Sequence, residues 1–171
     1  MSHLDRLYCV VGYDVDGIAA DFPKGFYKYM GQKQPSKLKE WSDPFIEENF
    51  SCVLANNDFW LNLPLLNKYE GQKIDVYITS RPCPSWVTRL WLIDNGWPDR
   101  PVLTVGHDQS KVAAAKMVGL THFIDDKPQN AIELHNLGVH AVLYEPYYLD
   151  HSNCGIDFIS GKLPFNPFTR H

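Results

Sequence analysis

Residues 7–17 have the sequence Leu-Tyr-Cys-Val-Val-Gly-Tyr-Asp-Val-Asp-Gly, an apolar run that ends in two carboxylates. A continuous apolar run is typical of a strand buried on both faces of a parallel sheet. Because residues two apart on a strand share a face, Asp14 and Asp16 are predicted to lie together where the strand ends. The working residues of open parallel sheets lie just beyond the carboxyl ends of strands. The run therefore predicts a buried first strand and a candidate site. The alternative is a pair of solvated carboxylates that cap the next helix.

The rest of the chain alternates between strand-like and helical patterns. Four further strand-like runs follow at residues 74–79, 102–105, 122–124 and 139–144. Helical patterns separate these later runs at residues 84–95, 111–118 and 128–137. Each helical pattern starts at a Pro or after a Ser and stops before a Gly, which are ordinary helix start and stop signals. We therefore predict an α/β fold whose parallel sheet is covered by helices on both faces.

One long segment interrupts this alternation. Residues 18–73 separate the first two predicted strands, which is far more chain than a simple crossover needs. The segment contains helical patterns at residues 18–30 and 57–66, ten aromatic residues, and seven Lys against seven Asp and Glu. We expect a small, mainly helical lobe over the strand ends. Four of its aromatic residues are candidates for stacking on a nucleobase, the alternative being that they form the core of the lobe: Trp41, Phe45, Phe59 and Trp60.

Length, charge and cysteine spacing narrow the class of protein. The 171 residues suit one domain, with a core at residues 1–17 and 74–150, an insertion at residues 18–73 and a tail at residues 151–171 that packs on the domain or pairs with a second copy. The chain has 16 Lys and Arg against 20 Asp and Glu and no basic run, which disfavours a nucleic-acid polymer as partner. No apolar run is long enough for a membrane helix. The four cysteines are far apart in the sequence, so we expect reduced thiols and a cytoplasmic protein.

The ends of the other predicted strands also carry reactive groups. Thr79 and Ser80 follow the second strand, where a hydroxyl can hold a phosphoryl oxygen or cap a helix. Lys111 begins a helical pattern, against the usual preference of the helix dipole; Lys116 is its rival for a site role. Asp125 and Asp126 follow the fourth strand. Adjacent carboxylates suit a hard divalent cation such as Mg²⁺, although they also suit the cap of the next helix.

The order of these groups resembles the haloacid-dehalogenase-like (HAD) superfamily of phosphohydrolases. Its four motifs match, in turn, residues 14–17, residues 78–80, Lys111 and residues 124–126. The resemblance implies a Rossmann-like, doubly wound parallel sheet with a cap inserted after the first strand. Within the superfamily, residues 14–22 and 59–64 resemble the 5′(3′)-deoxyribonucleotidases. Two features depart from that family: the short stretch before the second strand, and Arg81 between Ser80 and the following Pro.

The resemblance implies a Mg²⁺-dependent phosphomonoester hydrolase that acts on a small phosphate ester, most closely a nucleoside monophosphate. Asp14 is then the nucleophile and Asp16 the general acid and base. Thr79, Ser80 and Lys111 bind the phosphoryl group. Asp14, Asp126 and the backbone carbonyl of Asp16 bind the metal, and Asp125 orients its ligands. Alternatives within the superfamily are a polynucleotide-end phosphatase, which the lack of a basic groove disfavours, and a phosphatase of another small metabolite.

Two alternatives carry no catalytic turnover. A phospho-signalling receiver module also combines an acidic pair, a second Asp, a Thr or Ser and a Lys. Its acidic pair comes first along the chain, whereas here Asp125 and Asp126 come last. A degenerate relative that serves only as a binding protein is disfavoured, because every motif residue is present.

Overall fold

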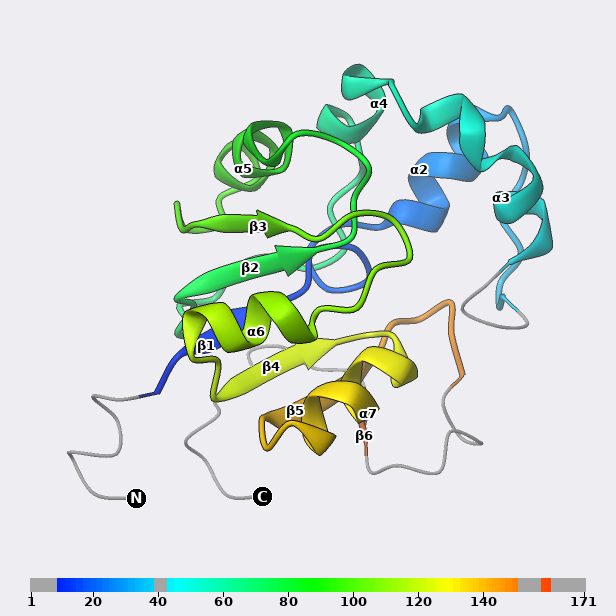
Figure 1. Ribbon diagram of the computed structural model, residues 1–171. Helices are drawn as coiled ribbons and strands as arrows, with labels where there is room; N and C mark the ends of the chain where they lie inside the picture. The colour runs from blue at the N-terminus through cyan, green and yellow to red at the C-terminus, as the bar shows by residue number, and fades with distance from the viewer. Residues whose placement is uncertain (1–8, 39–42, 151–157, 161–171) are drawn as a thin grey trace.

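The predicted parallel sheet is present in the computed structural model of the protein (Figure 1). The structure describes residues 9–38, 43–150 and 158–160. Six parallel strands lie in the order β3-β2-β1-β4-β5-β6. Their bounds are β1 Val11–Tyr13, β2 Val76–Thr79, β3 Val102–Thr104, β4 His122–Asp125, β5 His140–Glu145 and β6 Phe158–Ser160. The five strands predicted from the sequence are confirmed, and β6 was not predicted. The chain order reverses between β1 and β4, and in a sheet of this kind the crevice at such a point is where ligands bind.

Helices cover both faces of the sheet. On β2, Val76 and Ile78 point to one face, where they pack with α6 (Val112–Val118) and α7 (Pro128–Asn136). Tyr77, between them in sequence, points to the opposite face and packs with α5 (Ser85–Asp94) and the inserted segment. This alternation follows from the two-residue period of a strand. The structure therefore confirms the prediction of a Rossmann-like α/β fold.

The segment between β1 and β2 folds as four short helices: α2 Phe22–Tyr29, α3 Pro44–Asn49, the 3₁₀ helix η1 Phe50–Val53 and α4 Asn57–Leu61. The first predicted helix begins later than expected, because the carboxylate of Asp21 accepts a hydrogen bond from the backbone N–H of Lys24 and starts the helix there. The predicted helix at residues 57–66 ends at Leu61, before Pro64, which has no N–H to continue it. These helices lie beyond the carboxyl ends of the central strands (Figure 1).

The inserted segment shares its core with the sheet. Phe26, Phe59 and Trp60 are buried in the same cluster as Tyr13 and Tyr77 from β1 and β2. Two backbone hydrogen bonds, from Asp21 N to Pro64 O (2.8 Å) and from Leu66 N to Ala19 O (2.7 Å), hold its two ends together. The segment is therefore fixed against the sheet at the point where the candidate site begins.

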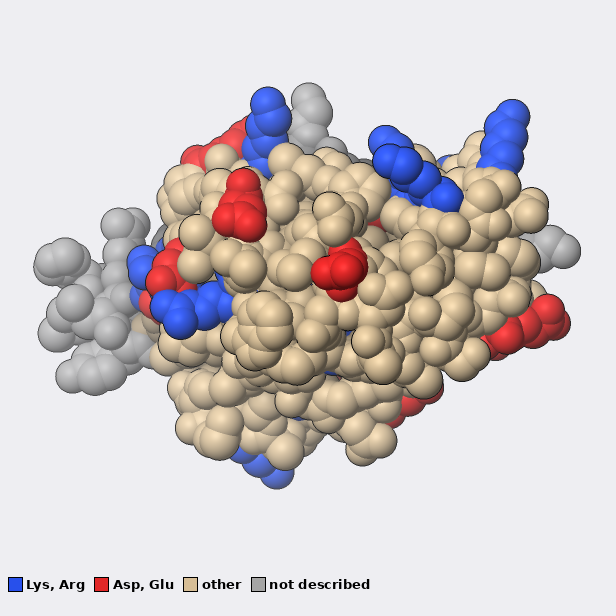
Figure 2. Space-filling model, turned by 90° about the horizontal axis from the view of Figure 1, so that it is seen from above, with Lys and Arg blue, Asp and Glu red and all other residues tan. Residues whose placement is uncertain are grey.

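The surface above α4 and α5 carries few charges. Viewed from above, scattered Lys, Arg, Asp and Glu side chains surround a large uncharged area (Figure 2). On α5 the side chains of Trp86, Leu90 and Ile93 are exposed. In the described part of the chain, no helix combines the length and the apolar character that a membrane crossing requires.

Candidate active site

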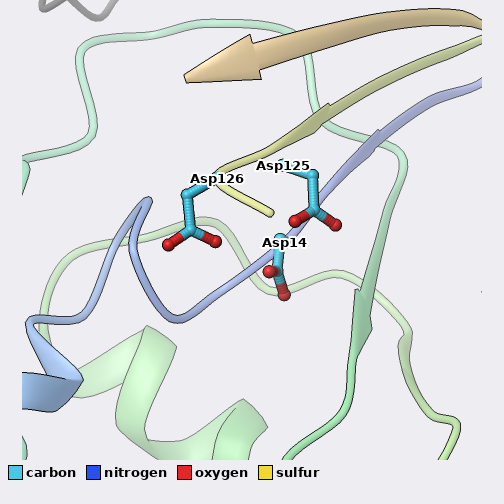
Figure 3. A group of neighbouring side chains, drawn as sticks. All are labelled: Asp14, Asp125 and Asp126. Atoms are coloured by element: carbon cyan, nitrogen blue, oxygen red, sulfur yellow. The ribbon is translucent and has the colours of Figure 1, made fainter. Parts of the chain in front are cut away.

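Three carboxylates meet at the carboxyl ends of two neighbouring strands. Asp14 follows β1, and its backbone N–H bonds to the carbonyl of Ile124 on β4 (2.9 Å). Asp125 ends β4 and Asp126 follows it. Figure 3 shows the three side chains converging from these two strands. Each offers an oxygen atom within 4.8 Å of the others, and all three residues are buried. The pairing of β1 with β4 thus brings together groups that lie more than 100 positions apart in the sequence.

Lys111 is buried among these carboxylates. Its Nζ lies 2.9 Å from Asp14 Oδ1 and 2.7 Å from Asp125 Oδ2. It is the N-cap residue of α6, which explains how a lysine at a helix start reaches the strand ends. Its rival Lys116 is exposed on the same helix. The structure therefore brings Lys111 into the site and leaves Lys116 outside it.

Asp125 is held by three donors of the protein. Besides Lys111, it accepts hydrogen bonds from the backbone N–H of Lys127 (2.8 Å) and from Nδ2 of Asn130 on α7 (3.0 Å). Both of its oxygens are therefore engaged by protein donors. Such a carboxylate is suited to fixing the positions of its neighbours, which is the role that the family resemblance implies for Asp125.

Burial and charge act in opposite directions on this group. Desolvation raises the pKa of the Asp14 carboxyl to about 7, although the charge of Lys111 opposes the rise. Burial alone would lower the pKa of Lys111, but Asp125 and Asp14 more than offset it and raise the pKa above its ordinary value. Lys111 therefore stays charged, and the three carboxylates together outnumber the cation that faces them.

This surplus of negative charge suits a divalent metal ion. Hard cations such as Mg²⁺ prefer carboxylate oxygens and bind through one or two of them together with a phosphate. The turn after β1 leaves room for the carboxylate of Asp126. Gly17 has a φ of 81°, and a Cβ at this position would overlap that carboxylate. The residues present thus fit a Mg²⁺ ion between the two strand ends.

Asp16 is not part of the group formed by the other three carboxylates. It forms a two-point ion pair with Arg81: Arg81 Nε donates to Oδ2 (2.9 Å) and Nη2 donates to Oδ1 (2.8 Å). In the sequence, Arg81 stands out only as a departure from a family pattern, and no local signal predicts that it pairs with Asp16. The two residues are 65 positions apart and meet only through the turns that follow β1 and β2.

A cavity of about 790 Å³ lies between the strand ends and the inserted segment. Among the predicted site residues, it is lined by Asp14, Asp16, Thr79, Ser80, Lys111, Asp126 and Trp60. Thr79 is almost fully buried, and its hydroxyl oxygen accepts a hydrogen bond from the backbone N–H of Arg81 (3.3 Å). The structure thus places both predicted phosphate-binding hydroxyls on the cavity wall.

Two of the aromatic residues predicted to stack on a base lie away from the cavity. Phe45 and Phe59 do not line the cavity; they pack within the inserted segment, where both lie against Phe26. Trp41 lies outside the described residues.

Other rings line the cavity instead. Phe22 and Phe50 form part of its wall, and Phe50 stacks on His107 of the core with ring centroids 4.3 Å apart. The helical period of an aromatic-rich segment does not distinguish a cavity wall from a core. The sequence alone therefore could not show which of these rings line the cavity.

The chain matches no model in a scan of protein families, and no curated protein matches it.

Proposed function

We propose that the protein is a Mg²⁺-dependent phosphomonoester hydrolase of the HAD-like type, in which the inserted segment acts as a cap over the site. One observation carries the proposal. Asp14 and Asp125 share the buried Lys111, with Asp126 beside them, at the carboxyl ends of adjacent parallel strands. A nucleophilic carboxylate, a cation for the phosphoryl oxygens and a pair of carboxylates for a metal are the groups that phosphoryl transfer through a covalent enzyme intermediate needs.

The metal would be held by the carboxylates of Asp14 and Asp126 and by the backbone carbonyl of Asp16, with Asp125 orienting these ligands. When bound, Mg²⁺ would neutralise negative charge on the phosphoryl oxygens. All other functions fall to the chain itself. Lys111 and the hydroxyls of Thr79 and Ser80 bind phosphoryl oxygens, and burial of the site excludes water from the first step.

The reaction proceeds in two displacements. An Asp14 oxygen attacks the phosphorus as the bond from phosphorus to the ester oxygen breaks, and that oxygen takes a proton from Asp16. Water then attacks the aspartyl-phosphate and gives its proton to Asp16 as the bond from phosphorus to the Asp14 oxygen breaks. The products are the alcohol and inorganic phosphate, and both carboxylates return to their starting states.

The cavity favours a substrate with a single phosphate and an uncharged leaving group. Its described lining includes seven Asp and Glu against three Lys and Arg, and two of these cations are paired with carboxylates. A second phosphate on the substrate would be repelled there. Phe22, Phe50 and Trp60 offer rings against which a base can pack. We therefore favour a nucleoside monophosphate over a polynucleotide end, with another neutral metabolite monophosphate as the second candidate.

The test is phosphate release from a panel of nucleoside mono- and bisphosphates, with Mg²⁺ or with EDTA. We expect Mg²⁺-dependent release from some monophosphates, slower release from bisphosphates, and loss of turnover in Asp14→Asn. The matched control is Asp94→Asn, which makes the same change on the exposed side of α5 and should retain full activity. Undiminished activity in Asp14→Asn would exclude the mechanism. Release from a generic aryl phosphate but from no nucleotide would preserve the chemistry and reject the nucleotide assignment.

A further inference from the structure

Arg81 and Lys111 are the two almost completely buried cations among the described residues that line the cavity. The Arg81 side chain has no exposed surface, whereas the Asp16 side chain that it pairs with is 18% exposed and lines the cavity. Among the described residues, Asp16 is the acidic partner of this guanidinium in an ion pair, and Nη1 of Arg81 makes no hydrogen bond. Arg81 is therefore the member of the pair that is buried in the protein, and Asp16 is the member that faces the cavity.

Two indole rings lie close to the guanidinium. Its central carbon lies 5.6 Å from the ring of Trp60 on α4 and 5.2 Å from the ring of Trp91 on α5. Both indoles are themselves tied to the inserted segment, since Trp60 Nε1 donates to Val53 O (2.9 Å) and Trp91 Nε1 donates to Leu63 O (2.9 Å). A planar cation packed against two rings loses little further freedom when it binds a carboxylate at two points.

We propose that Arg81 is a positioning residue that holds the carboxylate of Asp16 in the orientation for proton transfer to and from the reacting oxygens. Because Trp60 packs against Arg81 and Leu63 accepts a hydrogen bond from Trp91, the inserted segment contributes to this orientation through the guanidinium. The inference rests on the proposed function, in which Asp16 is the general acid and base. It goes further because it gives a role to Arg81, which acts on the reaction through Asp16.

The experiment compares two substrates that differ in their need for a proton on the leaving oxygen. p-Nitrophenyl phosphate releases a stable anion, whereas a nucleoside 5′-monophosphate releases an alkoxide that must be protonated. In Arg81→Lys, which keeps the charge but loses the two-point contact, we expect the rate of leaving-group release in a single turnover to fall by about 10- to 100-fold for the nucleotide. The fall for p-nitrophenyl phosphate should be at least several-fold smaller. A merely structural role would lower both rates by the same factor, and that result would overturn the proposal.

A second variant gives an independent check. In the Asp16→Asn background, Arg81→Lys should cause little further loss with either substrate, because the group that Arg81 positions is already gone. A full additional loss in the double variant would reject the positioning role. If Arg81→Lys does not fold, Trp91→Phe keeps the ion pair but weakens one of the two ring contacts of Arg81, at a residue that does not line the cavity. It should show the same preference for p-nitrophenyl phosphate, in smaller measure, and equal loss on both substrates would count against the proposal.

The matched control is Arg89→Lys. Arg89 also pairs with an aspartate at two points, through Nε and Nη2 to Asp99 (both 2.6 Å), but this pair is exposed and lies outside the cavity. Arg89→Lys should leave the rates of cleavage of both substrates unchanged. The failure of the proposed function is distinguishable from the failure of this inference. In the first case the unmodified protein cleaves neither substrate, and in the second it cleaves both and Arg81→Lys lowers them equally.

Discussion

At the scale of single residues, the site depends on one buried cation. Lys111 is 2% exposed and serves two carboxylates at once. Removing one partner of a buried charge group leaves the others uncompensated, which is costlier than losing an exposed pair. We therefore expect the lysine to stabilise the fold, in addition to its proposed role in binding a phosphoryl group.

We expect Lys111→Met to abolish turnover and to lower the free energy of unfolding by roughly 3 kcal/mol at pH 8. The loss should be smaller at pH 5, because Asp14, whose pKa burial raises to about 7, can then become neutral by taking up a proton. Urea denaturation at the two pH values measures this difference. Lys116→Met, on the exposed side of the same helix, should change neither stability nor activity. Equal losses for Lys111→Met at both pH values would contradict the argument.

The raised pKa of Asp14 predicts how the stability of the metal-free protein depends on pH. Its pKa is about 7 in the fold against an ordinary value of 3.8, so between these values the folded chain keeps a proton that the unfolded chain has lost. Stability in EDTA should therefore fall as the pH rises from about 4 to about 7. Because protons compete with the metal at Asp14, Mg²⁺ should stabilise the protein more at pH 8 than at pH 5.5. Denaturation of Asp14→Asn should show a shallower pH dependence, and identical slopes would disprove the assignment.

At the scale of elements, the turn after β1 is the most constrained part of the site. Gly17 combines a positive φ with close contact to the carboxylate of Asp126. Gly119, at the end of α6, also has a positive φ (63°), but a Cβ there would meet no atom within 4 Å. The two glycines thus separate backbone strain from crowding at the site.

Gly17→Ala should lose Mg²⁺-dependent activity and should displace Asp126, since the new methyl group needs the space of the carboxylate. Gly119→Ala should cost about 1 kcal/mol of stability from strain alone and should keep its activity. Thermal unfolding with and without Mg²⁺ gives the comparison. The stabilisation by Mg²⁺ should disappear in Gly17→Ala and persist in Gly119→Ala. Retained stabilisation in Gly17→Ala would mean that Asp126 does not bind the ion.

The elements that the sequence predicts correctly are those with strong local signals. Apolar runs predict β1 to β5, and Pro, Ser and Gly mark α5, α6 and α7 closely. The acidic groups of the site are also predictable, because parallel strands align their carboxyl ends. The pair of Arg81 with Asp16 and the stack of Phe50 on His107 are not, since each depends on how two distant loops pack. The strand β6 has no distinctive pattern of its own, and its place follows from pairing with β5.

At the scale of the whole molecule, the inserted segment and the sheet surround one cavity from opposite sides. The strand ends and the start of α6 supply Asp14, Asp126 and Lys111, and the insertion supplies Phe22, Phe50 and Trp60. Two of the contacts between these parts lie at the cavity: Phe50 stacks on His107, and Trp60 lies near Arg81. In the proposed function, the chemistry and the recognition of the leaving group are therefore divided between parts that touch at the site itself.

The apolar cluster that joins the insertion to one face of the sheet has a consequence for how the protein comes apart. Since Phe26, Phe59 and Trp60 pack in the same cluster as Tyr13 and Tyr77, the insertion cannot open without exposing that face to water. The protein should therefore melt in a single cooperative step, with amides of α2 and β2 exchanging their hydrogens at the same slow rate. Two separate steps in calorimetry would show otherwise. Unlike a detachable module, this insertion could not be transplanted to another scaffold without the aromatic face against which it folds.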